Sequence, residues 1–399
     1  MSTIKHHPAP VHSPEPFNII TKPIGPLCNI NCEYCFYLDK AGLFPGKNRA
    51  DFVMSDAVLK SYIRQYIDSQ PPGIEEVNFV WQGGEPTLLG LDFFQRALSY
   101  QQRYKRAGMT VTNSLQTNAT LMDESKAAFF AEHDFLLGVS IDGPERMHDR
   151  YRKDRSGKGT FRQVMAGLER IKKHNIRFNT LTVVQENNSK HPLELYSFLK
   201  DIGSAFMQFI PIVDTIPGTN MALARSVSAK DWGDFLASIF DEWIKADIGR
   251  IFVGHFDMLL GLYAGYPSSM CVHAKTCGRA MAVEHNGDLY SCDHFVRPEN
   301  YLGNLQTADL CALVDSRKQQ DFGQAKIAAL PRECRTCEFL RFCYGGCPKD
   351  RLLETGNGKL NWLCVGYKKL YRHCHPYMKA MLKAIEGGLP AADYARFMD

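Results

Sequence analysis

The sequence lacks several features that mark whole classes of protein. No apolar run approaches the roughly 18 residues that a membrane-spanning helix needs, so we expect no membrane contact. Charge of one sign is not in excess either, because 47 lysines and arginines face 43 aspartates and glutamates. The concentrated basic face of a nucleic-acid binder is therefore not expected. Residues 1–16 hold four prolines but no apolar stretch of a secretory signal, which predicts a mobile tail and a cytoplasmic location.

Cysteine is absent from residues 36–270 and abundant on either side. The chain of 399 residues has 13 cysteines, of which three lie within residues 28–35 and ten follow residue 270. In a reducing compartment, clustered cysteines bind metal more often than they form disulfides. The sequence therefore predicts two separate metal-binding regions.

Short runs rich in β-branched and aromatic residues alternate with amphipathic stretches through the first half of the chain. The predicted strands are Asn18–Lys22, Val77–Trp81, Thr110–Gln116, Phe135–Ile141, Arg177–Val184 and Phe206–Ile210. The predicted helices are Ser55–Asp68, Gly90–Ala107, Glu124–His133, Thr160–His174 and Pro192–Ile202. Six strand–helix repeats predict an α/β fold with parallel strands, a partial (β/α)6 barrel whose chemistry lies at the carboxyl ends of the strands.

The chain divides by composition into a barrel and a cysteine-rich part. We expect the barrel over 17–230, a helical connector over 231–265, a second domain over 266–374 and a C-terminal helix with a mobile end over 375–399. The second domain is rich in loops and has little periodicity, so metal centres are expected to replace part of its core.

Three cysteines follow the first predicted strand with the spacing C-x3-C-x2-C. Cys28, Cys32 and Cys35 offer three thiolates on a short loop, which can hold three irons of a [4Fe–4S] cluster and leave the fourth open for a substrate or cofactor. A zinc site is the alternative, but zinc would need a fourth ligand and none follows nearby.

A second motif, Gly83-Gly84-Glu85-Pro86, stands where the second strand is expected to end. This turn and the cysteine spacing, with the aromatic Tyr34 directly before the third cysteine, resemble the radical S-adenosylmethionine (SAM) enzymes. Glycine at such a turn lets the backbone approach the methionine end of SAM, whose amino group can donate to exposed carbonyl groups. The resemblance implies SAM contacts from Gly83, Gly84 and Glu85, and a contact from the Tyr34 backbone to adenine.

The same resemblance implies three further SAM contacts. Ser140 ends a predicted strand, Arg152 would supply a cation for the SAM carboxylate, and Val213 would pack on adenine. Two of them have a structural alternative. Ser140 would satisfy a buried backbone group, and Arg152 would lie in a solvated, charge-rich loop.

The second cysteine region resembles the SPASM domain of many peptide-modifying radical SAM enzymes. Its eight thiolates make two complete sets of four, which is typical of electron-transfer or structural clusters. In two-cluster ferredoxins the last cysteine of a comparable run, here Cys347 before Pro348, serves the other cluster. The family pattern then implies one auxiliary cluster on Cys271, Cys277, Cys292 and Cys347 and another on Cys334, Cys337, Cys343 and Cys364. A pair of zinc-ribbon sites is the alternative, and Cys311 and Cys374 stay unassigned.

The closest resemblance is to the anaerobic sulfatase-maturating enzymes, which oxidise a cysteine or serine of a sulfatase to Cα-formylglycine. It spans about residues 17–375 and includes Ile20-Thr21-Lys22-Pro23, Cys35-Phe36-Tyr37-Leu38-Asp39, Gln82-Gly83-Gly84-Glu85-Pro86-Thr87-Leu88, Leu115-Gln116-Thr117-Asn118 and Cys292-Asp293. The resemblance implies SAM and three [4Fe–4S] clusters as cofactors, with Asp293 as the base that takes the substrate thiol or hydroxyl proton.

The implied reaction begins when an electron enters the first cluster and SAM is cleaved. The resulting 5′-deoxyadenosyl radical takes a hydrogen atom from the substrate Cβ, and an auxiliary cluster is a suitable acceptor for the second electron. The implied partners are a sulfatase polypeptide with a Cys- or Ser-x-Pro-x-Arg motif and a reductant such as flavodoxin or ferredoxin. The sequence does not distinguish a cysteine target from a serine target.

Two other functions stay open. One is a SPASM enzyme that forms a thioether or carbon–carbon crosslink in another peptide, although only about sixteen residues precede the first strand and no N-terminal peptide-recognition domain is evident. The other is an iron–sulfur electron carrier or zinc-stabilised interaction protein, which would leave the three-cysteine loop and the Gly83-Gly84-Glu85-Pro86 turn unexplained.

Overall fold

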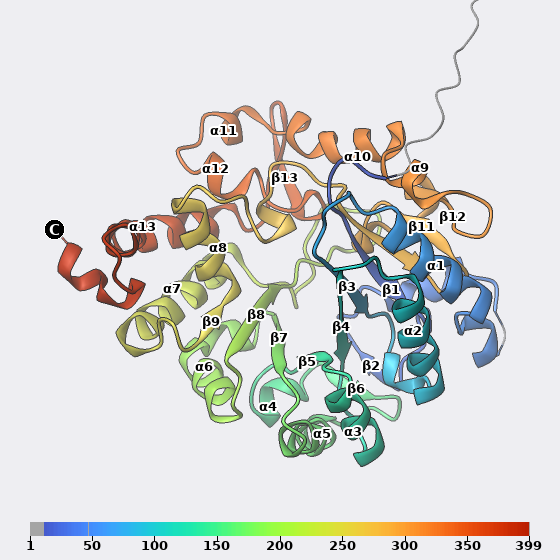
Figure 1. The fold of residues 1–399 in the computed structure, drawn as a ribbon. Helices are drawn as coiled ribbons and strands as arrows, with labels where there is room; N and C mark the ends of the chain where they lie inside the picture. The colour runs from blue at the N-terminus through green and yellow to red at the C-terminus, as the bar shows by residue number, and fades with distance from the viewer. Residues whose placement is uncertain (1–11, 47, 399) are drawn as a thin grey trace, which may run out of the picture.

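The computed structural model describes residues 12–46 and 48–398, so most of the predicted tail 1–16 lies outside the described residues. A single ten-stranded sheet organises the described chain, in the order β12-β11-β10-β1-β3-β4-β5-β7-β8-β9 (Figure 1). Two-stranded pairs β2-β6 and β13-β14 complete the strands of these residues. None of the described helices has the length and apolar character required to cross a membrane.

Six parallel strands form the centre of the sheet. They are β1 (Asn18–Lys22), β3 (Glu76–Trp81), β4 (Thr110–Thr117), β5 (Leu136–Ser140), β7 (Phe178–Val184) and β8 (Phe206–Pro211). Every neighbouring pair among them is parallel. All six were predicted from the sequence to within one residue at each end, and the predicted partial (β/α)6 barrel is confirmed.

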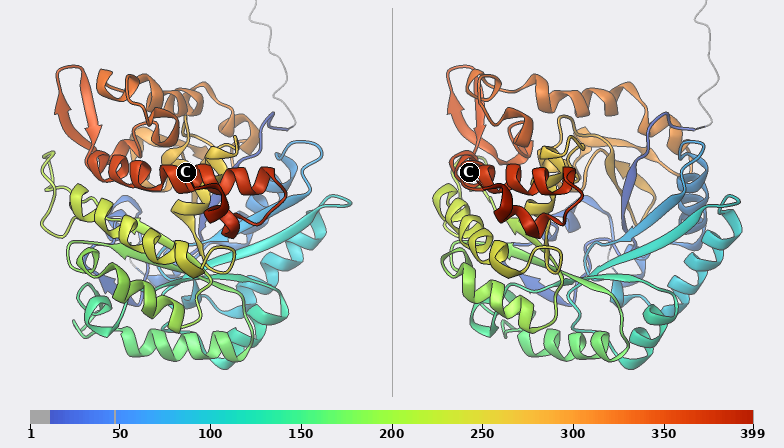
Figure 2. Two further views of the ribbon diagram at one scale, coloured as in Figure 1. Left: turned by 90° about the vertical axis from the view of Figure 1, so that its left-hand side faces the viewer. Right: turned by 60° about the vertical axis from the view of Figure 1, so that its left-hand side comes forward.

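Helices follow these strands and lie on the outside of the curved sheet (Figures 1 and 2). They are α1 (Asp56–Asp68), α2 (Leu91–Tyr104), α3 (Glu124–Glu132), α4 (Glu145–His148), α5 (Phe161–Lys173) and α6 (Pro192–Asp201). N-terminal capping explains where α1 and α3 begin, since the side chains of Ser55 and Asp123 accept hydrogen bonds from backbone N–H groups three residues later. The inner face of α1 packs Tyr62 against Phe79 and Trp81 of β3, and all three side chains are fully buried.

The segment 231–265, expected as a helical connector, lies mostly within two helices and also adds a strand to the sheet. It consists of α7 (Ala229–Ala246), β9 (Phe252–Val253) and α8 (Gly254–Tyr263). The short β9 pairs in parallel with β8. The long helix α13 (Cys364–Glu386) runs beside α7 and already begins at Cys364, the last of the eight predicted cluster ligands, earlier than the helix expected after residue 374 (Figure 2).

The cysteine-rich region continues the barrel sheet. Its strand β10 (Ala280–Glu284) pairs in parallel with β1, and β11 (Asp288–Tyr290) and β12 (Tyr301–Asn304) follow as antiparallel neighbours. The remaining elements are α9 (Leu310–Val314), α10 (Arg317–Ala328), α11 (Arg332–Arg335), α12 (Leu340–Cys343), β13 (Arg351–Thr355) and β14 (Gly358–Asn361). The carboxyl end of β1 therefore lies between the barrel and the second cysteine region.

Candidate functional site

The first cysteine group lies at the carboxyl end of β1. The loop after this strand contains β2 (Ile30–Cys32), which pairs antiparallel with β6 (Arg152–Asp154) and sets Cys32 opposite Arg152. Cys28, Cys32 and Cys35 line one hollow of about 260 Å³ together with Tyr37 and Gly84. The structure thus brings the three predicted ligands together beside the predicted SAM turn.

The chemistry of this hollow suits an iron–sulfur cluster. Burial raises the pKa of the Cys28 thiol to about 11 and that of Cys32 to about 12, so these thiols hold their protons at neutral pH unless a metal displaces them. The Asn118 side-chain amide lies 3.7 Å from the Cys28 sulfur, and the Arg152 guanidinium lies 3.9 Å from the Cys32 sulfur. Both are N–H donors that would stabilise thiolate charge. The donor set therefore fits a thiolate-bound cluster.

The turn after β3 is held tightly against the cysteine loop. The backbone N–H of Gly84 donates to Gly25 at 2.9 Å, and that of Glu85 donates to Leu27 at 2.8 Å. A Cβ on Gly84 would lie 1.8 Å from the Leu27 carbonyl oxygen, and Gly83 has the left-handed φ of +132°. Only glycine allows this approach. The predicted motif is thus also the contact that joins β3 to the cluster loop.

Glu85 uses its side chain inside the protein. The carboxylate is buried and accepts from the Thr87 backbone at 3.0 Å, the Thr117 hydroxyl at 2.7 Å and the Asn118 backbone at 2.7 Å. These bonds fix the end of β4, from which Asn118 reaches Cys28. A contact between Glu85 and SAM stays a prediction.

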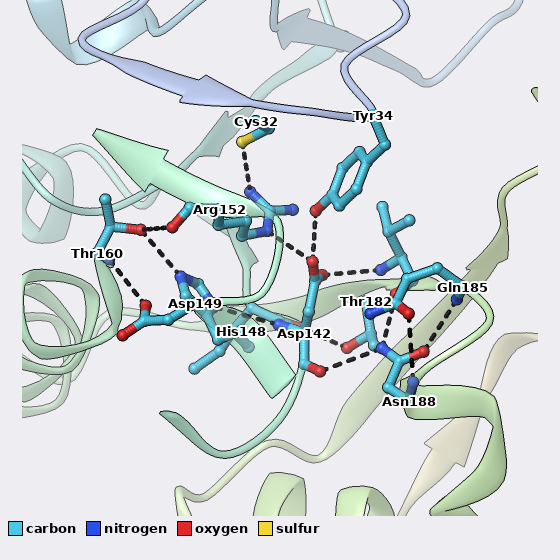
Figure 3. A network of polar contacts seen from close by, with 12 residues as sticks. Cys32, Tyr34, Asp142, His148, Asp149, Arg152, Thr160, Thr182, Gln185 and Asn188 are labelled. Carbon is cyan, nitrogen blue, oxygen red and sulfur yellow. Dashed lines mark hydrogen bonds and ion pairs between the residues drawn. The ribbon is translucent and has the colours of Figure 1, made fainter. Parts of the chain in front are cut away.

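A buried network surrounds the predicted SAM contacts Tyr34 and Arg152 (Figure 3). The Arg152 Nε lies 3.0 Å from the Asp142 carboxylate, which also accepts from the Tyr34 hydroxyl and from the Val183 backbone. The Arg152 guanidinium lies 5.6 Å from the centre of the Tyr34 ring. Arg152 is only 7% exposed, so the alternative of a solvated loop residue is wrong. Its contact with SAM stays a prediction.

Ser140 and Val213 lie at the carboxyl ends of their strands. Ser140 is the buried last residue of β5, and its hydroxyl forms no hydrogen bond to another described residue. Val213 follows β8 and belongs to the main core, whereas its neighbour Ile212 packs in a small cluster with Cys32 and Tyr34. The contacts of Ser140 and Val213 with SAM stay predictions, and Ile212 is a nearby apolar residue that the sequence did not single out.

The predicted base Asp293 is buried at an ion pair. It begins a 3-10 turn directly after Cys292, and Lys22 Nζ lies 2.6 Å from its Oδ1. Burial raises the pKa of Asp293, but the charges of Lys22, His294 and Lys40, with the hydrogen bond from Lys22, together leave the pKa below its ordinary value. Lys22 also donates to Gln82 at 2.7 Å and lies 4.7 Å from the centre of the Tyr37 ring. Asp293 is therefore held ionised between the first cysteine loop and Cys292.

Sequence reasoning missed Lys22, Gln82 and Asn118 as site residues. All three belong to motifs that were noted, and all three stand at or just after the end of a parallel strand. Their place at strand ends was the signal that could have identified them.

The second region brings eight of its ten cysteines together in two groups of four. Cys334, Cys337, Cys343 and Cys364 line a hollow of about 420 Å³. Cys271, Cys277, Cys292 and Cys347 form the other group, in which the charge of each thiol acts on its neighbours. These are the two groups that the resemblance implies, and their roles as cluster ligands stay predictions. Cys311 and Cys374 are buried and lie outside the lining of the 420 Å³ hollow.

The distances between the cysteine side chains can be compared with those that the alternative zinc sites would need. Among the described residues, no three or more histidine, cysteine, aspartate or glutamate side chains converge closely enough to hold a single metal ion. Four sulfurs around a hollow suit a cluster of several metal atoms, whose thiolate ligands stand farther apart than those of tetrahedral zinc.

Comparisons with known proteins agree with this geometry. The profile of the Radical SAM superfamily matches residues 23–199, and that of the SPASM iron–sulfur cluster-binding domain matches residues 271–338. A serine-type anaerobic sulfatase-maturating enzyme of Bacteroides thetaiotaomicron is 43% identical over 93% of this chain and 92% of its own. A cysteine-type enzyme of Clostridium perfringens is 34% identical over 90% of this chain and 97% of its own. The structure of native anSMEcpe with bound AdoMet and Cp18Cys peptide superposes with a TM-score of 0.83 at 33% identity, covering 93% of this chain and 99% of that one.

Proposed function

The chain belongs to the anaerobic sulfatase-maturating enzymes of the radical SAM superfamily, and from this premise we propose that it oxidises a serine of a sulfatase polypeptide to Cα-formylglycine. It is a radical SAM enzyme, and its cofactors are SAM and [4Fe–4S] clusters. The higher identity to serine-type relatives, 43% against 34% for the cysteine-type enzyme, supports serine as the target. The bound peptide of the related structure supports a polypeptide substrate.

We propose that Cys28, Cys32 and Cys35 hold the catalytic cluster. When bound, this cluster and SAM supply a 5′-deoxyadenosyl radical, which removes one hydrogen atom from the substrate Cβ. The chain's own contribution is to keep the three thiols in one hollow and to press the backbone of Gly84 against their loop. Arg152 lies 3.9 Å from the Cys32 sulfur and would bind the carboxylate of SAM, and Ser140, at the end of β5, would be a further SAM contact.

The observation that carries the proposal is the ion pair between Asp293 and Lys22. A base for the substrate hydroxyl must be ionised before the reaction, and a nearby cation keeps a buried carboxylate ionised. Lys22 supplies this cation at 2.6 Å and is itself fixed by Gln82 on the turn that touches the first cysteine loop. Asp293 accepts the hydroxyl proton, while the carbon radical would give up one electron to an auxiliary cluster and its C–O bond would become a double bond.

We further propose that the two groups of four cysteines hold two auxiliary [4Fe–4S] clusters, which makes three clusters with the catalytic one. A reductant such as flavodoxin or ferredoxin would supply the electron for SAM cleavage. The substrate motif would be Ser-x-Pro-x-Arg, with Cys-x-Pro-x-Arg as the other peptide to compare.

The test uses the cluster-loaded enzyme under anaerobic conditions, with SAM, a reductant and the two peptides. Mass spectrometry would measure the aldehyde and 5′-deoxyadenosine. Aldehyde on the serine peptide is the expected result. Aldehyde on the cysteine peptide alone would overturn the serine target, and deoxyadenosine without any aldehyde would favour a different peptide modification.

A variant separates Asp293 from the rest of the site. Asp293→Asn is expected to cleave SAM but to form aldehyde at least about a hundredfold more slowly, the usual size of a general-base contribution. Asp321→Asn, on the exposed face of α10, is the matched control and is expected to behave as the parent enzyme. Normal aldehyde formation by Asp293→Asn would remove Asp293 from the proposed role.

A further inference from the structure

Two buried cations lie among the cysteines of the second region. Lys326 is on α10 and is 1% exposed, and Arg351 begins β13 and is 8% exposed. Neither forms an ion pair with an aspartate or glutamate of the described residues. Burial without a counter-charge is costly for a cation and lowers the pKa of both groups, so a nearby anion would stabilise their charged forms.

Lys326 faces the group formed by Cys271, Cys277, Cys292 and Cys347. Its ammonium donates to the backbone carbonyls of Cys271 at 2.9 Å and Val272 at 3.0 Å, and also to that of Ala274. Thiolates at Cys277, Cys347 and Cys271 would lie close enough to act on its charge. Lys326 therefore binds the loop that carries Cys271 and presents a positive charge to three of the four thiols.

Arg351 lies between the two groups. Its guanidinium donates to the carbonyls of Lys326 at 2.8 Å, Tyr344 at 3.1 Å and Gly345 at 3.2 Å. The thiols that act on it belong to both groups: Cys334 and Cys343 to one, Cys277 and Cys347 to the other.

Two of the three carbonyls that Arg351 binds, those of Tyr344 and Gly345, lie on the segment that joins the two groups. This segment, between Cys343 and Cys347, has three consecutive residues with left-handed φ, +42° at Tyr344, +74° at Gly345 and +63° at Gly346. A Cβ on Gly345 would lie 3.0 Å from an Arg351 nitrogen. The turn thus folds closely around the guanidinium and fixes its charge between the groups.

A four-thiolate [4Fe–4S] cluster is the anion that this arrangement requires. Four thiolates outweigh the charge of the iron–sulfur core, so the ligated cluster is negative and becomes more negative when it is reduced. A fixed cation nearby stabilises the reduced form more than the oxidised form, and hydrogen bonds and local charge are among the factors that set cluster potentials.

We propose that Lys326 and Arg351 form a cationic bridge between the two auxiliary cluster sites and raise the reduction potentials of both. The inference rests on the auxiliary clusters of the proposed function. In that reaction the substrate carbon radical gives up one electron as Asp293 takes the hydroxyl proton, and the cationic bridge favours transfer of this electron to an auxiliary cluster. Lys326 and Arg351 are positioning residues, since their charge acts through the clusters.

The test compares Lys326→Met with Lys326→Arg in the full-length, cluster-loaded enzyme. Iron content and the midpoint potentials of the auxiliary clusters would be measured by anaerobic redox titration with EPR detection. The catalytic cluster is recognised by the change in its signal on addition of SAM. Lys326→Met is expected to lower the equilibrium constant for reduction at least tenfold, which is about 59 mV for one electron. Lys326→Arg is expected to keep both iron and potential.

Lys318→Met is the matched control, because Lys318 is an exposed lysine on the same helix. Loss of iron or a lower potential in Lys326→Met, with Lys326→Arg intact, supports the bridge. Equal iron content and equal midpoint potentials in Lys326→Met and Lys326→Arg would overturn the proposed cationic bridge. No substrate peptide is used in these measurements. If no aldehyde forms on the sulfatase peptides but Lys326→Met and Lys326→Arg still differ in midpoint potential, the proposed function fails and the cationic bridge stands.

Discussion

Single residues decide the geometry of the first cysteine hollow, and Gly84 offers the sharpest test. Gly84→Ala would place a methyl group 1.8 Å from the Leu27 carbonyl oxygen, so the turn and the cysteine loop must separate. We expect this variant to lose the catalytic cluster, about four irons per chain, while retaining the auxiliary iron. Iron analysis of the purified protein measures the loss.

Gly42→Ala is the control for this substitution. A Cβ on Gly42 would meet no atom within 4 Å, so its iron content should equal that of the parent. A Gly84→Ala protein with full iron and normal SAM cleavage would show that the loop yields to the methyl group.

Lys22, the ion-pair partner of the proposed base Asp293, is the second residue whose role can be measured. Lys22→Met keeps the length of the side chain but removes the charge beside Asp293, so the buried carboxylate would favour its protonated form. We expect aldehyde formation to fall at least about tenfold while SAM cleavage is retained, since a base must be ionised to act. The ratio of aldehyde to 5′-deoxyadenosine measures this uncoupling. An unchanged ratio would show that Lys22 is dispensable.

The sequence predicts the cysteines and the glycine turn because their spacing is local. Lys22 and Asp293 are far apart in the chain, and only the parallel pairing of β1 with β10 brings them together. Lys326 and Arg351 were missed because an isolated lysine or arginine in a sequence usually lies at the surface of the protein. Local chemistry was therefore predictable, and the charges that tune it were not.

At the scale of elements, the ion pair between Asp142 and Arg152 joins the loop after β5 to β6. Both side chains are buried, so Arg152→Met would leave an uncompensated carboxylate and cost about 3 kcal/mol of unfolding free energy. The double variant Asp142→Asn/Arg152→Met is expected to be more stable than Arg152→Met, because it removes both charges. Thermal unfolding of the parent, Asp142→Asn, Arg152→Met and the double variant, all loaded with clusters, completes the cycle. A double variant less stable than Arg152→Met would contradict this account.

The packing of α8 on α7 makes stability depend on pH. His255 is buried against the Trp232 ring, and burial lowers its pKa to about 4 from an ordinary value near 6.5. As pH falls through 6.5 the unfolded chain takes up a proton that the folded chain does not, so stability decreases toward pH 4. At pH 5.5 the loss is about 1 kcal/mol.

The measurement compares thermal midpoints at pH 7.5 and 5.5 for the parent and His255→Leu. The variant should lose less stability on acidification, by a few degrees at most. His133→Leu, which removes an exposed histidine at the end of α3, is the control and should follow the parent. Equal acid sensitivity of the parent and His255→Leu would exclude His255 as the cause.

The strands also show where prediction from sequence ends at this scale. The six central strands were predictable because each is followed by an amphipathic helix, and the alternation identifies parallel pairing. The strand β10 was not, because another strand and not a helix follows it, and its partner β1 lies far away in the chain. The cysteine-rich region consequently looked like a separate unit in the sequence, although three of its strands extend the barrel sheet.

At the scale of the whole molecule, this continuous sheet predicts that the barrel does not fold alone. A fragment of residues 12–265 would lose β10 and expose the full edge of β1, whose Ile19 is completely buried in the intact chain. It would also lose α13 from the face of α7. An unpaired apolar edge strand promotes aggregation. We therefore expect the fragment to elute as aggregates in size-exclusion chromatography and to lack a cooperative thermal transition.

A chain ending at Glu386 loses no strand and should remain monodisperse and bind its iron. A monomeric, cooperatively folding fragment would instead show that the six parallel strands are sufficient, and that the second cysteine region was added to a barrel already stable without it.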